Sequence, residues 1–92
     1  MSLETVRFAA ANRLCIELGY QRRIRVIEPY SLRRGRDGYL LLHALKADTR
    51  EHRSYRVDRM ESVRVTTRPF RPVYAVELAS LSPLSAPPTS RP

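Results

Sequence analysis

The chain has 92 residues, enough for one small domain, and its 17 Lys and Arg against nine Asp and Glu give a net charge of +8 at pH 7. Hydrophobic residues make up 42% of the sequence, which excludes a wholly disordered basic chain. No apolar run reaches the about 18–20 residues of a membrane span, and the single cysteine, Cys15, excludes an internal disulfide. We therefore expect one cytoplasmic domain that does not enter a membrane.

The first predicted element is a short helix. Ser2 is a favourable N-cap, and Asn12 is a residue type that often ends a helix in the left-handed conformation. Between them, Leu3, Val6 and Ala10 share one face at helical spacing. This face is expected to pack on the core.

Alternating apolar and polar residues then predict five short strands, over residues 14–20, 23–29, 39–45, 54–58 and 62–66. The connections are too short for helical crossovers, so the sheet is expected to be antiparallel and to form a small barrel. Pro29 either limits the second strand or marks a bulge. Residues 33–38 contain two glycines and are expected to form a hairpin loop.

The C-terminal part of the sequence changes composition. Residues 79–92 hold four prolines and four serines and no aromatic residue, which predicts a disordered tail and a folded domain over residues 2–78. Residues 73–78 either add an edge strand or pack against the barrel.

Three sequence motifs resemble the bacterial WYL domain. Arg-Ile-Arg-Val-Ile-Glu-Pro-Tyr at residues 23–30 is similar to the family's R-x-R-x-V-E-P strand, and Gly-Tyr-Leu at 38–40 takes the place of the name-giving Trp-Tyr-Leu, with glycine for tryptophan. Arg-Ser-Tyr-Arg-Val-Asp-Arg-Met at 53–60 resembles R-x-F-R-L-D-R-I, and Tyr20 falls where the family has a tyrosine. The resemblance covers about residues 5–72.

The resemblance implies a mainly β fold, a small five-stranded antiparallel SH3/Sm-like barrel with a short N-terminal helix. It also implies a ligand-sensing or nucleic-acid-binding module. Such modules usually accompany a DNA-binding helix-turn-helix, CRISPR and phage-defence proteins or helicases, so a larger regulatory or effector protein is an expected partner.

Alternation in the strands indicates which side chains are available for binding. If Leu40, Leu42 and Ala44 face the core, Tyr39 and His43 face outward. If Ile24 and Val26 face inward, Arg23 and Arg25 face outward, and Arg56 does the same beside the inward Tyr55. Arg53 and Arg59 belong to the third motif. The predicted binding residues are therefore Arg23, Arg25, Tyr39, His43, Arg53, Arg56 and Arg59.

The sequence offers no pattern typical of catalysis or metal binding. His43, His52 and Cys15 lack the spacing of a metal site, and no nucleophile lies near a base in a recognisable order. Glu28 is expected to pair with an arginine, and Asp58 to cap backbone N–H groups in a tight turn. We expect neither enzymatic activity nor a cofactor.

Arginines interleaved with a tyrosine and a histidine suit phosphate contacts and base stacking. The leading hypothesis is a module that recognises single-stranded nucleic acid or a nucleotide-like anion in bacterial transcriptional regulation or phage-defence control. A structural dimerisation domain whose arginines are only a solvated face, and an Sm-like RNA-binding protein acting as a ring, remain alternatives. Because the core is small, we also expect a homodimer formed through residues 73–78 or Leu41.

Overall fold

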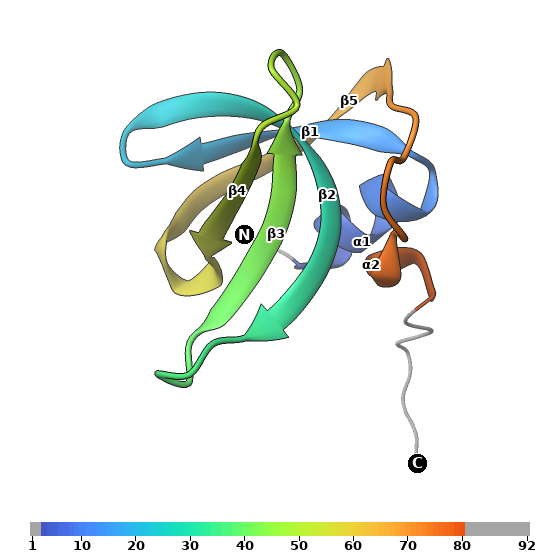
Figure 1. The fold of residues 1–92 in the computed structure, drawn as a ribbon. Coiled ribbons are helices and arrows are strands. Elements are labelled where there is room, and N and C mark those ends of the chain that lie inside the picture. The colour runs from blue at the N-terminus through green and yellow to red at the C-terminus, as the bar shows by residue number, and fades with distance from the viewer. Residues whose placement is uncertain (1–2, 81–92) are drawn as a thin grey trace.

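The fold is a five-stranded sheet with two short helices on one side, as Figure 1 shows for a computed structural model that describes residues 3–80. The predicted tail at 79–92 overlaps the last helix at 79–80 and otherwise lies outside the described residues. In chain order the elements are α1 (Leu3–Ala11), β1 (Leu14–Tyr20), β2 (Arg23–Arg34), β3 (Leu40–Lys46), β4 (His52–Arg56), the 3₁₀ helix η1 (Val57–Arg59), β5 (Met60–Pro69) and α2 (Glu77–Ser80).

All five strands are antiparallel and lie in the order β4-β3-β2-β1-β5, which confirms the mainly β fold with a short N-terminal helix. The order is typical of an SH3-like barrel, with the short η1 between β4 and β5. Over residues 3–80 the sheet stays open, because β4 and β5 each pair with one neighbour and not with each other. The long, curved β2 carries the sheet around the core (Figure 1).

Helix α1 packs the predicted face onto the core, where Val6 and Ala10 are fully buried. The left-handed residue after the helix is Arg13, with φ of 56°, and not Asn12 as predicted. Asn12 instead donates from its side-chain amide to the carbonyl of Phe8 at 2.9 Å, which satisfies one of the free carbonyls at the helix end. The predicted cap Ser2 lies outside the described residues.

The face of β2 that meets the core is the reverse of the predicted one. Ile24 is 65% exposed, whereas Ile27 is fully buried opposite Ile16. Residues that face each other across an antiparallel pair share a side of the sheet, so Arg25, opposite the buried Leu18, projects on the core side. The prediction that Arg23 and Arg25 join Tyr39 on one outer surface is therefore wrong.

A bulge in the middle of β2 reverses which of its alternate residues point to the core side of the sheet. The pairing with β3 shifts register between Pro29 and Ser31, so Pro29 marks a bulge and β2 continues to Arg34. Because the extra residue is Tyr30, both Tyr30 and Ser31 project from the side of the sheet on which Phe70 and Tyr74 pack, and Leu32 lies on the opposite side with Leu42.

The segment after β5 crosses this outer side of the sheet and covers part of it. Val76 and Leu78 are buried, and the ring of Phe70 lies 5.5 Å from that of Tyr30 between centroids. Of the two arrangements expected for residues 73–78, the structure shows packing against the sheet, and α2 continues the segment along α1 and β2.

Candidate ligand-binding site

The side of β2, β3 and β4 that points away from the core forms one continuous surface, called here the outer face. Two rows of directly paired residues cross it. Ser31 pairs with His43, which pairs with Ser54, and Arg33 pairs with Leu41, which pairs with Arg56. Side chains in such rows stand about 5 Å apart, a spacing that lets one ligand span several of them.

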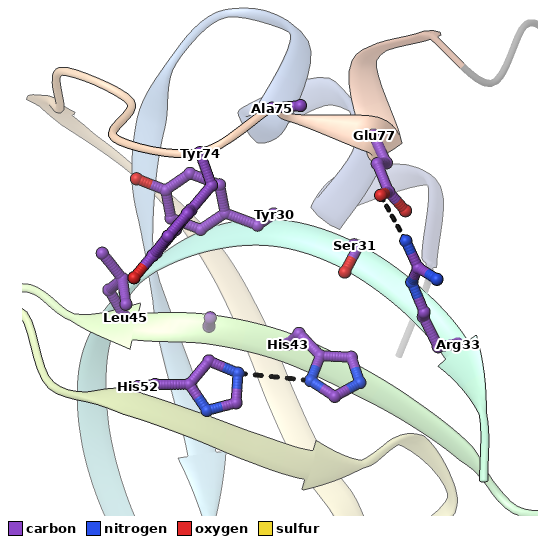
Figure 2. A pocket seen from close by; sticks show the side chains of 10 residues that line it. Tyr30, Ser31, Arg33, His43, Leu45, His52, Tyr74, Ala75 and Glu77 are labelled. Atoms are coloured by element: carbon purple, nitrogen blue, oxygen red, sulfur yellow. Dashed lines mark hydrogen bonds and ion pairs between the residues drawn. The ribbon is translucent and has the colours of Figure 1, made fainter.

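A pocket of about 330 Å³, called here the outer pocket, lies between this face and the C-terminal segment. That volume is at the lower end of the range for small-ligand sites. Figure 2 shows the rings of Tyr30 and Tyr74 on one side of it, His43 and His52 on the floor, and Arg33 and Glu77 at the far end. The site thus combines aromatic surfaces with a few polar groups.

The two histidines interact directly. His43 Nδ1 lies 3.3 Å from His52 Nε2, and their rings stack with centroids 5.4 Å apart. Ser54 Oγ lies 3.0 Å from the same Nδ1. Burial lowers the pKa of His43 below its ordinary 6.5, and the positive charges of His52 and Arg33 lower it further. His43 is therefore mostly neutral at pH 7.

Arg33 connects the strand side of the outer pocket to its C-terminal wall. Its guanidinium forms an ion pair with the carboxylate of Glu77, the first residue of α2 (Figure 2). Both side chains are partly exposed, so the pair contributes little to stability. An anion in the pocket would compete with Glu77 for this guanidinium.

Next to the outer pocket, Arg56 lies over the ring of Tyr39, with its guanidinium carbon 3.5 Å from the ring centroid. The guanidinium donates from Nε and Nη2 to the carboxylate of Asp58 at 3.0 and 2.7 Å, and this pairing lowers the pKa of Asp58. Asp58, expected to cap backbone N–H groups, thus holds Arg56 in place.

The structure brings three of the seven predicted binding residues to the outer face, namely Tyr39, His43 and Arg56. Arg53 pairs with Glu51 at 2.9 Å at the start of β4, and Arg59 is exposed on η1.

A second pocket, called here the basic pocket, has a volume of about 380 Å³ and shares no lining residue with the outer pocket. The other two predicted residues line it, with Ile24, Val26, Lys46, Ala47, Asp48, Tyr55 and Arg68 alongside Arg23 and Arg25.

The comparison with protein families agrees with the motifs in the sequence. The family model of the WYL domain matches residues 1–65. The chain belongs to the WYL domain family. A search of curated proteins finds no significant match. WYL domains are in general regulatory, ligand-sensing domains, and that general role applies to this chain.

The WYL match ends within β5, so the C-terminal wall of the outer pocket comes from residues beyond it. Tyr74 and Glu77 belong to this wall, and no motif indicated them. Tyr30 was missed because its position depends on the bulge, although the preceding Pro29 signalled one. The predicted fourth strand begins at residue 54, whereas His52 is the first residue of β4.

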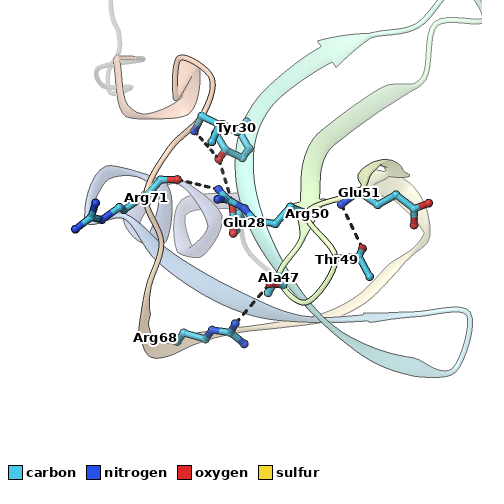
Figure 3. Close-up of polar contacts among 9 residues, drawn as sticks. Glu28, Tyr30, Ala47, Thr49, Arg50, Glu51, Arg68 and Arg71 are labelled. Carbon is cyan, nitrogen blue, oxygen red and sulfur yellow. Dashed lines mark hydrogen bonds and ion pairs between the residues drawn. The ribbon is translucent and has the colours of Figure 1, made fainter.

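A buried carboxylate in this WYL domain holds the C-terminal segment against β2 (Figure 3). Glu28 is 4% exposed and accepts hydrogen bonds from Arg50 Nη2 at 2.8 Å and from the Tyr30 hydroxyl at 3.0 Å. Arg50 also donates to the carbonyl of Arg71, and the amide of Val73 donates to the Tyr30 hydroxyl. The expected pairing of Glu28 with an arginine is confirmed.

Three further features bear on what the WYL domain does. Among residues 3–80, no group of three or more His, Cys, Asp and Glu side chains is placed to hold a metal ion. In the same residues no helix has the length and apolar character needed to cross a membrane. Burial raises the pKa of the Cys15 thiol, so the thiolate is disfavoured and Cys15 acts as a small core residue.

Proposed function

We propose that the outer face binds a ligand that carries both an aromatic ring and an anionic group, either a nucleotide or a segment of single-stranded nucleic acid. The observation that carries this proposal is the outer pocket, whose walls include two tyrosine rings and whose polar groups include the histidine pair and Arg33, with Ser31 and Glu77 beside them. Rings of this kind stack on bases of any sequence.

The neighbouring pair of Tyr39 and Arg56 supports a ligand longer than one nucleotide. Leu41 lies between this pair and His43 along the outer face, and Arg56 sits across from it on β4. A strand of nucleic acid that places one base in the outer pocket would bring the next toward the Tyr39 ring, where a phosphate meets Arg56.

Binding at this position would be communicated through the C-terminal segment. An anionic group that takes Arg33 from Glu77 removes one of the contacts that fix α2 against β2. The proposed role is a non-catalytic sensing module whose occupancy is passed to a larger regulatory or effector protein, in transcriptional control or phage defence.

The test is a fluorescence-anisotropy titration of a labelled single-stranded oligonucleotide with the protein. Tyr74→Ala removes one aromatic wall and is expected to weaken binding by about 1–3 kcal/mol, the range for one stacked base. Val73→Ala is the matched control, because Val73 is similarly exposed but does not line the pocket. If both variants bind like the unaltered protein, the outer pocket is not the site.

A second candidate is self-association through the same side of the molecule. Tyr74 is 62% exposed and Val73 57% exposed, whereas Val76 and Leu78 of the same segment are already buried within the monomer. An interface of two copies would therefore use Val73 and Tyr74. Light scattering over a concentration series separates a monomer, the proposed dimer and a ring.

A further inference from the structure

The histidine pair on the floor of the outer pocket has a geometry that the proposed function does not use. His43 lies in β3 and His52 begins β4, nine residues further along the chain, a spacing that does not indicate a metal site in a sequence. The antiparallel pairing brings the two side chains together, because His43 pairs with Ser54 and His52 lies two residues before Ser54 on the same strand. Residues at this diagonal position project from the same side of the sheet.

The separation of the two facing nitrogens suits the coordination of one metal ion. Figure 2 shows that each ring turns one nitrogen toward the other, and His43 Nδ1 lies 3.3 Å from His52 Nε2. Two imidazole nitrogens bound at about 2.0–2.1 Å to a tetrahedral Zn²⁺ lie about 3.3–3.4 Å apart. A metal ion beside the line between the nitrogens therefore meets both at bonding distance when the rings turn toward it, without a movement of either strand.

Both rings can present a lone pair to a metal ion while they remain neutral. In the hydrogen bond between them, one facing nitrogen carries a proton and the other accepts it. When that proton moves to the outer nitrogen of its own ring, both facing nitrogens are free to bind and neither ring changes its charge. Because the nearby Arg33 is paired with Glu77, its positive charge opposes a cation in the pocket only weakly.

The space next to the pair provides the remaining coordination positions. Both histidines line the outer pocket, whose volume of about 330 Å³ is enough for several water molecules. Ser54 Oγ lies 3.0 Å from His43 Nδ1 and places a hydroxyl beside the same point. Imidazole nitrogens favour metals such as Zn²⁺, Ni²⁺ and Cu²⁺ over Mg²⁺ and Ca²⁺, which prefer oxygen ligands.

We propose that His43 Nδ1 and His52 Nε2 together bind one divalent transition-metal ion, such as Zn²⁺, on the floor of the outer pocket, with water on its open positions. The site has two protein ligands, in agreement with the finding that residues 3–80 contain no group of three or more His, Cys, Asp and Glu side chains placed to hold a metal ion. This proposal does not depend on the binding of a nucleotide or nucleic acid at the outer face.

The experiment is isothermal titration calorimetry of the full chain with Zn²⁺, and with Mg²⁺ for comparison. Zn²⁺ is expected to bind with one-to-one stoichiometry, whereas Mg²⁺ should not bind measurably. Cu²⁺ should bind more tightly than Zn²⁺, and its electron paramagnetic resonance spectrum should show two coordinated imidazole nitrogens. Absence of Zn²⁺ binding, or equal binding of Zn²⁺ and Mg²⁺, would overturn the proposal.

The sequence simplifies the mutational test, because His43 and His52 are the only histidines in the chain. His43→Gln and His52→Gln should each weaken Zn²⁺ binding by at least about ten-fold, since even the loss of a ligand's hydrogen-bond partner costs that much in metal affinity. Cys15→Ala is the control for the single thiol, and it should leave the affinity unchanged because Cys15 is buried in the core. Zn²⁺ binding that survives both histidine changes, or that is lost in folded Cys15→Ala protein, would assign the metal to another group and reject the site.

Two conditions keep this proposal separate from the proposed function. Oligonucleotide titrations in the presence of EDTA measure binding at the outer face without a metal ion, and Zn²⁺ titrations without oligonucleotide measure the histidine pair alone. Failure of either proposal is therefore distinguishable from failure of the other.

Discussion

At the scale of single residues, the outer face depends on side chains whose partners hold them in fixed orientations. Asp58 occupies two donors of Arg56, and the guanidinium in turn covers one side of the Tyr39 ring. A planar guanidinium held in this way retains its charge and loses less rotamer freedom when it meets a phosphate. The pair is therefore organised for binding before any ligand arrives.

His43 provides a pH-dependent element, and the first prediction concerns it. Because its folded-state pKa lies below 6.5, the unfolded chain takes up this proton first. The stability that His43 contributes is complete above pH 6.5 and is lost as the pH falls below that value. An anionic ligand has the opposite effect, because it favours the protonated ring. Lowering the pH should therefore weaken the fold and strengthen oligonucleotide binding.

Thermal melts and anisotropy titrations on both sides of pH 6.5 check this prediction. His43→Gln should remove most of both pH dependences. His52→Gln should move the profile of His43 to higher pH, because it removes the charge of a ring 3.3 Å away. Oligonucleotide affinity that stays constant with pH would contradict the placement of an anionic group beside His43.

At the scale of elements, the sequence predicted the helix, the five strands and their antiparallel pairing from alternation and loop lengths. It failed in the second strand, where Ile24 was placed in the core and is exposed. Alternation fixes which residues share a face but not which face is inside, and the side is set here by pairing with β1. The bulge at Tyr30 then reversed the facing again, which a period of two does not show.

The dependence of the sequence prediction on regular alternation also explains which residues of the candidate site it identified and which it missed. Tyr39, His43 and Arg56 face outward as predicted, because the pairing of β3 with β4 has no register shift. Tyr74 and Glu77 reach the outer pocket only because the segment after β5 packs back onto the sheet. No local signal in the sequence indicates such a contact.

The second prediction concerns Glu28, which connects β2 with the C-terminal segment. Glu28→Gln leaves the shape almost unchanged but replaces the buried carboxylate that accepts from Arg50 and the Tyr30 hydroxyl. We expect a loss of about 1–3 kcal/mol in the free energy of unfolding, measured by urea denaturation. Hydrogen exchange at the Val73 amide should also accelerate, because the loss of the Glu28 charge weakens the hydrogen bond that fixes its acceptor, the Tyr30 hydroxyl.

Glu17→Gln is the matched control for this change. Glu17 also pairs with an arginine, Arg64, but that arginine side chain is 77% exposed. Pairs of this exposed kind contribute about 0–1 kcal/mol. Equal effects of the two substitutions on the unfolding free energy would mean that the C-terminal segment does not depend on the buried carboxylate.

At the scale of the whole molecule, the cationic side chains that give the net charge of +8 differ in whether a carboxylate pairs with them. On the outer face Arg33 and Arg56 are each paired with a carboxylate, whereas the cations of the basic pocket are mostly unpaired. A nucleic acid attracted by net charge alone would favour the end of the sheet with the basic pocket. Specific binding at the outer face must instead come from ring stacking and a small number of phosphate contacts.

The last prediction separates these two modes of binding by their dependence on salt. In a plot of the logarithm of the binding constant against the logarithm of salt concentration, each phosphate neutralised on a single strand contributes about −0.7 to the slope. Phosphate contacts from Arg33 and Arg56 therefore give a slope of about −1.4. Arg56→Ala should reduce the steepness by about 0.7. Tyr39→Ala should weaken binding by about 1–3 kcal/mol and leave the slope unchanged, because stacking releases no counterions. Arg36→Ala, on the exposed loop, should change neither quantity. A steeper slope that responds equally to Arg36→Ala and Arg56→Ala would show a diffuse basic surface and reject the outer face as a shaped site.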